Sequence, residues 1–378
     1  MTSAQLEIQV IAAVVAAACA LPGVFLVLRR MSLISDAITH AILPGIVLAF
    51  FVVEDLSSPL LVLGAATTGL VTVVLIELLR RTELVREDAA IGLVFPVLFS
   101  AGVVLIARFA DDVHLDIDAV LLGELAFAPF DRWVVAGYDL GPSALWLMGG
   151  ILVVNALFIG VFYKELKLAT FDAGLAVALG FSPALIHYAL MALVSVTAVG
   201  AFDAVGSVLV VALMIAPPAT AYLLTDRLSV MLGLAALIGA VAGIGGYWLA
   251  HWFDLSIAGS MAAVAGGIFG AVWLAAPQRG LVSLARRRTS QRWEFAQGAL
   301  AIHLLQHENQ PEAAEESEIE HLNRHLRWDP GFAAKVVRQA RRRGLVVQQN
   351  GTLALTDRGR AVADDLMVRE RLALESRP

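Results

Sequence analysis

Apolar segments of membrane-spanning length recur along the first three quarters of this 378-residue chain. A helix needs roughly 20 consecutive apolar residues to cross the hydrocarbon core of a bilayer. Because no water is available there, only a helix or a closed barrel satisfies the backbone hydrogen bonds. The sequence therefore predicts an all-α polytopic membrane protein. The predicted spans are 6–28, 33–53, 59–79, 89–108, 143–163, 184–200, 206–224, 229–252 and 257–276, which makes nine, or eight if residues 200–206 form a re-entrant break.

The composition excludes an ordinary soluble protein. Hydrophobic residues make up 59% of the chain and charged residues 16%, against about 45–50% and 25% in soluble domains. The first segment, Leu6–Leu28, is longer than the apolar core of a signal peptide and has no basic region before it, so we expect it to be retained. The single cysteine, Cys19, lies in this segment. Disulfide frameworks and cysteine-based metal sites are therefore not expected.

Charges in the loops orient the predicted spans. Lysine and arginine are enriched in the cytoplasmic loops of membrane proteins. If successive spans cross the membrane in alternating directions, one topology places all the basic clusters in the cytoplasm and the acidic clusters outside. This topology also places the C-terminal tail in the cytoplasm. The basic clusters are Arg29–Arg30, Arg80–Arg81 with Arg86, Lys164 and Lys167, Arg227, and Arg279 with Arg286–Arg288.

Asp36 and His40 are the most informative polar residues within a predicted span. Their i, i+4 spacing puts both side chains on one face of a helix. Charged groups at membrane depth are costly, and they normally face a cavity or a partner on an ion path. Carboxylate and imidazole groups are also good ligands for divalent transition metals. The pair therefore predicts a metal path, and the alternative is a hydrogen bond that holds two helices together.

A predicted external loop carries four carboxylates and a histidine. Its charged residues and histidine are Asp111, Asp112, His114, Asp116 and Asp118. One interpretation is a solvated loop. The other is a negative vestibule that raises the local concentration of cations.

The predicted cytoplasmic loop at residues 164–183 is long and patterned. It is typical of a short amphipathic helix that ends at Gly180 and Pro183. Such a helix either lies on the membrane surface or docks a cytoplasmic partner.

Four segments of residues 1–280 carry a resemblance to a known family. They are 30–45 (RMSLISDAITHAILPG), 86–95 (REDAAIGLVF), 171–180 (FDAGLAVALG) and 206–218 (GSVLVVALMIAPP). Together they resemble the permease subunits of metal-ion ABC transporters for zinc, manganese or iron. The resemblance implies a second permease protomer, a cytoplasmic ATPase pair and an extracellular or periplasmic metal-binding protein.

The resemblance also implies roles for particular residues. Asp36 and His40 would line the path, and a two-fold dimer would bring two copies of each together. The family's coupling helix, which seats on the ATPase, matches the segment containing Phe171, Asp172, Ala173, Gly180 and Pro183. The chain has no P-loop motif, so we expect ATP hydrolysis on a separate subunit and no enzymatic activity here. The metal would be transported, and no permanently bound cofactor is expected.

Composition changes abruptly after Arg288. Residues 293–307, 319–327 and 330–343 read as helices, and 345–356 reads as a hairpin whose Asn350-Gly351 pair favours a two-residue turn. A last helix is predicted from Thr356 or Asp357. The sequence thus divides into a membrane permease domain, 1–285, and a small cytoplasmic α+β winged helix-turn-helix domain, 289–378.

The tail resembles the winged-helix domain of iron- and manganese-dependent repressors. Those repressors carry a metal-binding histidine in the final helix, and the aligned position here is Glu370. Winged helices serve both DNA and protein binding. The acidic segment Glu308–Glu318 and the tether to a membrane favour a regulatory or interaction module, so nucleic acid is not an expected partner.

Two histidine pairs in the tail have i, i+4 spacing. They are His303 with His307 and His321 with His325. Each pair would supply two ligands from one helix face to a cytoplasmic metal sensor. The alternative is surface histidines without a ligand.

The family resemblance, together with the Asp36–His40 pair, therefore implies a plasma-membrane permease that imports manganese, zinc or iron through Asp36 and His40. Two alternatives remain open, a permease for a metal chelate and a membrane-tethered, metal-responsive DNA-binding regulator. A membrane metalloprotease is not expected, because the His-Glu-x-x-His motif is absent.

Overall fold

The computed structural model describes residues 2–54, 58–109, 125–135, 138–308, 326–349 and 352–375. The chain separates into two compact units, Met1–Gly280 and Leu281–Pro378. The first unit ends five residues before residue 285, where the predicted membrane domain ends.

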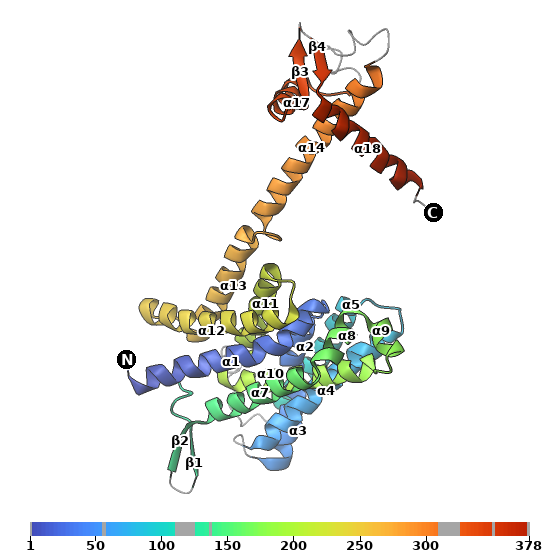
Figure 1. The fold of residues 1–378 in the computed structure, drawn as a ribbon. Coiled ribbons are helices and arrows are strands. Elements are labelled where there is room, and N and C mark those ends of the chain that lie inside the picture. The colour runs from blue at the N-terminus through green and yellow to red at the C-terminus, as the bar shows by residue number, and fades with distance from the viewer. Residues whose placement is uncertain are drawn as a thin grey trace. The chain divides into compact units, whose positions relative to one another are not determined.

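Nine candidate membrane spans lie among the described residues of the first unit. They agree with the nine predicted spans to within a few residues, and Figure 1 shows them as a bundle of helices. Gly206, with φ +78°, separates α10 (Pro183–Val205) and α11 (Ser207–Leu224) without a re-entrant segment, which favours nine spans over eight.

The described helices of the first unit, which include the short helices α8 and α9, are α1 (Ser3–Leu28), α2 (Leu33–Ala41), α3 (Leu43–Val53), α4 (Pro59–Arg81), α5 (Glu87–Phe109), α7 (Ser143–Val161), α8 (Tyr163–Phe171), α9 (Ala173–Ala178), α10 (Pro183–Val205), α11 (Ser207–Leu224), α12 (Leu228–Phe253) and α13 (Ile257–Ala275).

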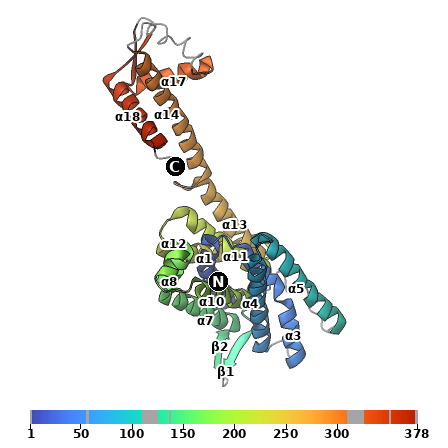
Figure 2. The same ribbon diagram turned by 90° about the vertical axis from the view of Figure 1, so that its right-hand side faces the viewer.

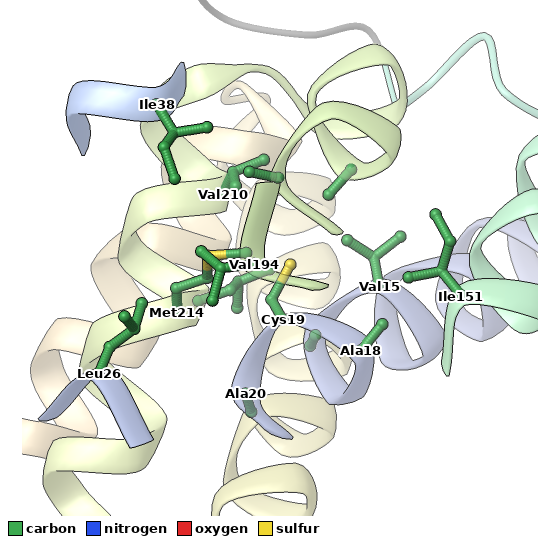
Figure 3. Packing of buried hydrophobic residues seen from close by; sticks show 14 of the residues in the cluster. Val15, Ala18, Cys19, Ala20, Leu26, Ile38, Ile151, Val194, Val210 and Met214 are labelled. Atoms are coloured by element: carbon green, nitrogen blue, oxygen red, sulfur yellow. The ribbon is translucent and has the colours of Figure 1, made fainter. Parts of the chain in front are cut away.

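Helix α1 forms the centre of this unit, packed against α7, α10, α11 and α12. Figure 3 shows buried side chains from α1, such as Val15 and Cys19, beside Val194 of α10 and Met214 of α11. Helices in lipid associate mainly through close packing, which small residues permit. A β-carbon at Gly239 of α12 would come 3.2 Å from the carbonyl oxygen of Ala16, so glycine there allows α1 and α12 to approach closely.

A β-hairpin precedes α7, and the sequence analysis missed it. Strands β1 (Arg132–Val135) and β2 (Tyr138–Pro142) pair antiparallel, and the hairpin extends from the bundle in Figures 1 and 2. The Arg132 guanidinium contacts Asp139 and Glu7 of α1. The Gly141 N–H donates to Asp139, and this bond together with Arg132 lowers the pKa of the Asp139 carboxyl. The strands are only four and five residues long, too short for alternation to predict them.

The second unit contains three helices and one hairpin among its described residues. They are α14 (Leu281–His307), α17 (Pro330–Arg342), β3 (Val346–Gln349), β4 (Thr352–Leu355) and α18 (Asp357–Glu375). Strands β3 and β4 pair antiparallel, with Val346 opposite Leu355. Leu300 of α14, Val336 of α17 and Leu353 of β4 are buried in one core. Four predicted elements are thus present: the first helix (α14), the helix at 330–343 (α17), the hairpin (β3 and β4) and the last helix (α18). The Asn350-Gly351 turn and most of the predicted helix 319–327 lie outside the described residues.

Candidate metal-translocation site

A hydrogen-bonded turn links α1 to α2, the helix that carries Asp36 and His40. Helix α1 ends in a Schellman motif, in which the Met31 N–H donates to the Leu26 carbonyl over 2.9 Å and the Arg30 N–H donates to Val27 over 3.1 Å. Arg30 occupies the left-handed position of this motif, with φ +61°. Helix α2 begins three residues later at Leu33. A short, hydrogen-bonded turn therefore ties the end of α1 to the helix that carries Asp36 and His40.

The second predicted span is two helices rather than one. Helix α2 ends at Ala41 and α3 begins at Leu43, with Ile42 between them. The cause is Pro44, which has no N–H to donate to the carbonyl of His40 four residues earlier and whose ring crowds that carbonyl. Broken helices of this kind mark binding sites in membrane transporters. The break therefore lies directly beside His40.

Asp36 and His40 face each other on α2, as their spacing predicts. The Asp36 Oδ1 atom lies 3.5 Å from His40 Nε2. The Thr39 hydroxyl donates to the Asp36 carbonyl, so it leaves the Asp36 carboxylate to its histidine partner. The side chains of His40 and Asp36 are 31% and 42% exposed. They are therefore accessible from outside this one chain.

The walls around the pair come from neighbouring helices. Phe95 and Phe99 of α5 lie beside the His40 ring, with ring centroids 6.2 and 6.4 Å away. Helix α2 also contacts α4, α10 and α11. Among the described residues, no group of three or more histidine, cysteine, aspartate or glutamate side chains is placed to hold a metal ion. One chain thus offers two ligands at this point, fewer than the four of a usual zinc site.

Glycines allow the helices around the site to approach closely. A β-carbon at Gly64 of α4 would lie 2.5 Å from the carbonyl oxygen of Gly45 on α3. A β-carbon at Gly69 of α4 would overlap the Ser195 hydroxyl of α10 and lie 3.1 Å from Ile38 of α2. Because Ile38 lies between Asp36 and His40, this contact joins α4 and α10 to the site helix.

The segment 163–183 forms two short helices instead of the single predicted one. Asp172 separates α8 from α9, and its carboxylate accepts the Leu175 N–H over 2.9 Å. Such a side-chain cap starts a new helix and competes with continuation of the old one. Phe171 is 60% exposed. Ala173 opens α9, Gly180 takes φ +85°, and Pro183 opens α10 after the Ser182 cap.

A partly buried polar cluster lies where α1, α8 and α10 meet, and the sequence analysis did not predict it. The Arg29 guanidinium donates to the Thr170 hydroxyl of α8 over 3.1 Å and lies 3.4 Å from His187 Nδ1 of α10. Burial lowers the pKa of Arg29 below its usual range. Thr170 and His187 are 141 and 158 residues away from Arg29 along the chain, so no local sequence pattern predicts the cluster.

Among the described residues, the remaining predicted ligands form no assembled site. The external loop residues Asp111, Asp112, His114, Asp116 and Asp118, and the tail pair His321 and His325, lie outside the described residues. The rings of His303 and His307 on α14 are 4.7 Å apart, and His303 is buried. Their neighbour Glu308 is bound by Arg360 of α18.

Comparison with known proteins decides the family. The pattern that defines the ABC 3 transport family matches residues 3–275. The chain belongs to this family. It is therefore a multi-pass plasma-membrane permease, the non-enzymatic membrane component of an ABC transporter.

Several relatives align with this ABC 3 permease over most of their length. The zinc transport system membrane protein TroD of Treponema pallidum is 48% identical over 358 residues, which are 95% of this chain and 97% of TroD. The manganese transport system membrane protein MntD of Bacillus subtilis is 46% identical over 282 residues, 75% of this chain and 95% of MntD. A solved structure, PsaBC from Streptococcus pneumoniae in complex with Fab, matches with a TM-score of 0.62 and 29% identity over 75% of this chain and 96% of that chain.

Proposed function

We propose that this ABC 3 permease imports zinc or manganese and that the metal passes Asp36 and His40. The observation that carries the proposal is the 3.5 Å contact between Asp36 Oδ1 and His40 Nε2 beside a broken span. Relatives named for zinc and manganese transport support the class of cargo. Iron, the third metal expected from the sequence, is not named among these relatives. Oxygen and nitrogen ligands without thiolate suit a site that must both select and release its metal.

The site is completed by a second protomer. Two ligands per chain and partly exposed side chains leave coordination positions open. A two-fold axis beside α2 doubles the set to two aspartates and two histidines, which is enough for a tetrahedral site. The match to PsaBC is consistent with a paired permease. A bare ion fits this small polar site better than an organic chelate does.

ATP hydrolysis on a separate subunit drives the transport through α8 and α9. The coupling residues are Phe171, Asp172, Ala173, Gly180 and Pro183. Helix α9 and the residues after it expose apolar side chains, among them Leu175, Val177 and Leu179. An exposed apolar surface of this kind, placed by the charge pattern in the cytoplasm, suits docking into a groove on an ATPase. An external binding protein delivers the metal from the other side.

The tail is a regulatory module with a winged-helix arrangement. The order α14, α17, β3, β4 and α18 around one core supports it. The alignment with TroD is longer than the membrane unit, so TroD shares at least part of the tail. Metal sensing in the tail would use ligands from the pair His303 and His307 or from the pair His321 and His325. The membrane topology that places the coupling segment in the cytoplasm places the tail there as well.

Uptake of radiolabelled zinc and manganese tests the transport proposal. Cells would express the chain with an ABC ATPase and a metal-binding protein of its kind. We expect wild-type uptake of at least one of the two metals and a loss of at least about tenfold in His40→Ala. His251→Ala is the matched control, because His251 is an exposed histidine at the end of α12 that stacks on Tyr247. Normal uptake by a well-expressed His40→Ala variant would refute the site.

Deletion of residues 289–378 tests the role of the tail. A transporter with a regulatory tail keeps metal uptake after the deletion and loses only its response to high intracellular metal. A tethered DNA-binding regulator, the alternative class, loses its entire output. Retention of uptake with an unchanged metal response would show that the tail does not regulate transport.

A further inference from the structure

The polar cluster around Arg29 links the coupling segment to α1 and α10. Arg29 caps the C-terminus of α1 and reaches Thr170, two residues before the Asp172 cap of α9. It also lies against His187, in the first two turns of α10. One side chain therefore connects α8, which leads into the proposed ATPase-docking helix, to both α1 and α10.

The cluster is partly buried, and two of its buried polar atoms have no hydrogen-bond partner in this conformation. Among the described residues of the cluster, Arg29 Nη2 and His187 Nε2 are buried without a hydrogen-bond partner. Nearly all buried polar atoms in proteins are hydrogen-bonded, because an unmade bond costs the desolvation of the group. Two such atoms at one helix junction are consistent with a second arrangement of the junction in which they find partners.

Two rigid connections lead from this cluster to the metal ligands. The first is the Schellman turn, which holds Arg29 to the start of α2 through the Met31 N–H bond to Leu26. The second is α10 itself. Ser195 lies eight residues after His187, a little over two helical turns, and there it meets Gly69 of α4 next to Ile38 of α2. A shift of α8 that moves Arg29 and His187 therefore reaches the helix of Asp36 and His40 by both routes.

A second charged cluster, on α4, lies next to the same junction. Glu77 of α4 binds Arg80 at 2.8 Å and Arg81 at 3.1 Å. Arg81 in turn donates to the Tyr188 hydroxyl, next to His187 on α10. The Arg81–Tyr188 bond joins α4 to α10 without involving Arg29, so the two helices stay joined when the Arg29 contact is lost.

We propose that Arg29 is a positioning residue that couples movement of α8 and α9 to α2, so that ATP hydrolysis reshapes the Asp36–His40 site. The inference rests on the proposed transport function. Arg29 does not touch the metal. It acts through the Thr170 and His187 contacts, which transmit the displacement of the docking segment. Loss of these contacts therefore separates ATP hydrolysis from metal movement and leaves metal binding at Asp36 and His40 in place.

The test compares Arg29→Gln with Arg30→Gln in the full transporter complex reconstituted in proteoliposomes. Arg30 is the adjacent arginine, is exposed, and makes none of the cluster contacts among the described residues. The readout is radiolabelled zinc or manganese taken up per ATP hydrolysed. We expect Arg29→Gln to hydrolyse ATP but to lose uptake per ATP by about tenfold or more, whereas Arg30→Gln matches wild type. A Lys at position 29 makes only one of the two contacts, so Arg29→Lys should be intermediate.

Thr170→Val provides a second variant in case Arg29→Gln fails to fold. It removes the acceptor hydroxyl with little change in volume, and we expect a smaller loss of uptake per ATP in the same direction. Combining it with Arg29→Gln should add nothing, because Arg29→Gln already removes the Thr170 contact that Thr170→Val breaks. Wild-type uptake per ATP in Arg29→Gln, or additive losses in the double variant, would overturn the inference. Absence of uptake from wild type and Arg30→Gln alike would refute the transport proposal itself, and this inference with it.

Discussion

Asp36 Oδ1 lies 3.5 Å from His40 Nε2 on α2, and Pro44 ends the helical hydrogen bonding directly after this pair. In the proposed site each residue supplies one ligand type to the same ion, so the two would act as a unit. We predict that Asp36→Asn and His40→Gln each lower metal uptake by about tenfold or more. The double variant should be little worse than either single variant, because residues that act together are not additive. Uptake rates of the four proteins measure this directly, and fully multiplicative losses would contradict a shared site.

The close approach of α3 and α4 predicts a stability effect. A methyl group at Gly64 would lie 2.5 Å from the Gly45 carbonyl oxygen and 2.8 Å from the Ala49 β-carbon. We expect Gly64→Ala to destabilise the protein by roughly 1–3 kcal/mol, the usual cost of overpacking. Thermal unfolding in nanodiscs provides the measurement. Gly149→Ala on α7 is the control, since nothing lies within 4 Å of the added carbon. Equal melting temperatures for the two variants would argue against the packing described for α3 and α4.

The exposed segment at α9 predicts a cross-link to the ATPase. Cys19 is the single cysteine and is fully buried, so a thiol reagent should not react with the native wild-type chain. Val177→Cys on α9 introduces a thiol at a 62% exposed position. We expect a bifunctional reagent to join it to the ATPase subunit. Val153→Cys on α7, 65% exposed within a candidate span, should give no such product. Cross-linking from Val153→Cys alone would place the ATPase contact elsewhere.

The contact between Glu308 and Arg360 predicts how acid affects the tail. A hydrogen bond from Arg360 lowers the pKa of the Glu308 carboxyl. Because the folded pKa lies below the unfolded value of about 4.3, the contact stabilises the tail above that pH and is lost as the pH falls through the folded pKa. We expect hydrogen exchange in the first turn of α18, corrected for intrinsic rates, to accelerate in that range. Glu308→Gln should reduce this pH dependence, and an identical pH profile in the variant would refute the contribution of the pair.

The sequence predicts much of this structure where one periodicity dominates locally. Span length and the i, i+4 rule predicted the candidate spans and the Asp36–His40 contact, since both depend on residues close in the chain. Pro44 was visible in the sequence, yet a proline in a membrane helix gives either a kink or a complete break, and the choice depends on packing. Asp172 is a similar case, because its capping bond to Leu175 outweighs the helical pattern around it. Arg29 was assigned only a topological role, since its partners come from helices far away in sequence.

Zinc K-edge X-ray absorption on the complete transporter, trapped with zinc bound, tests the central claim most directly. The account predicts nitrogen and oxygen ligands near 2.0–2.1 Å with no sulfur, together with the outer-shell scattering of imidazole. The imidazole signal should disappear in His40→Ala and persist in His251→Ala. Sulfur ligation, or an unchanged imidazole signal in His40→Ala, would contradict a metal path through Asp36 and His40.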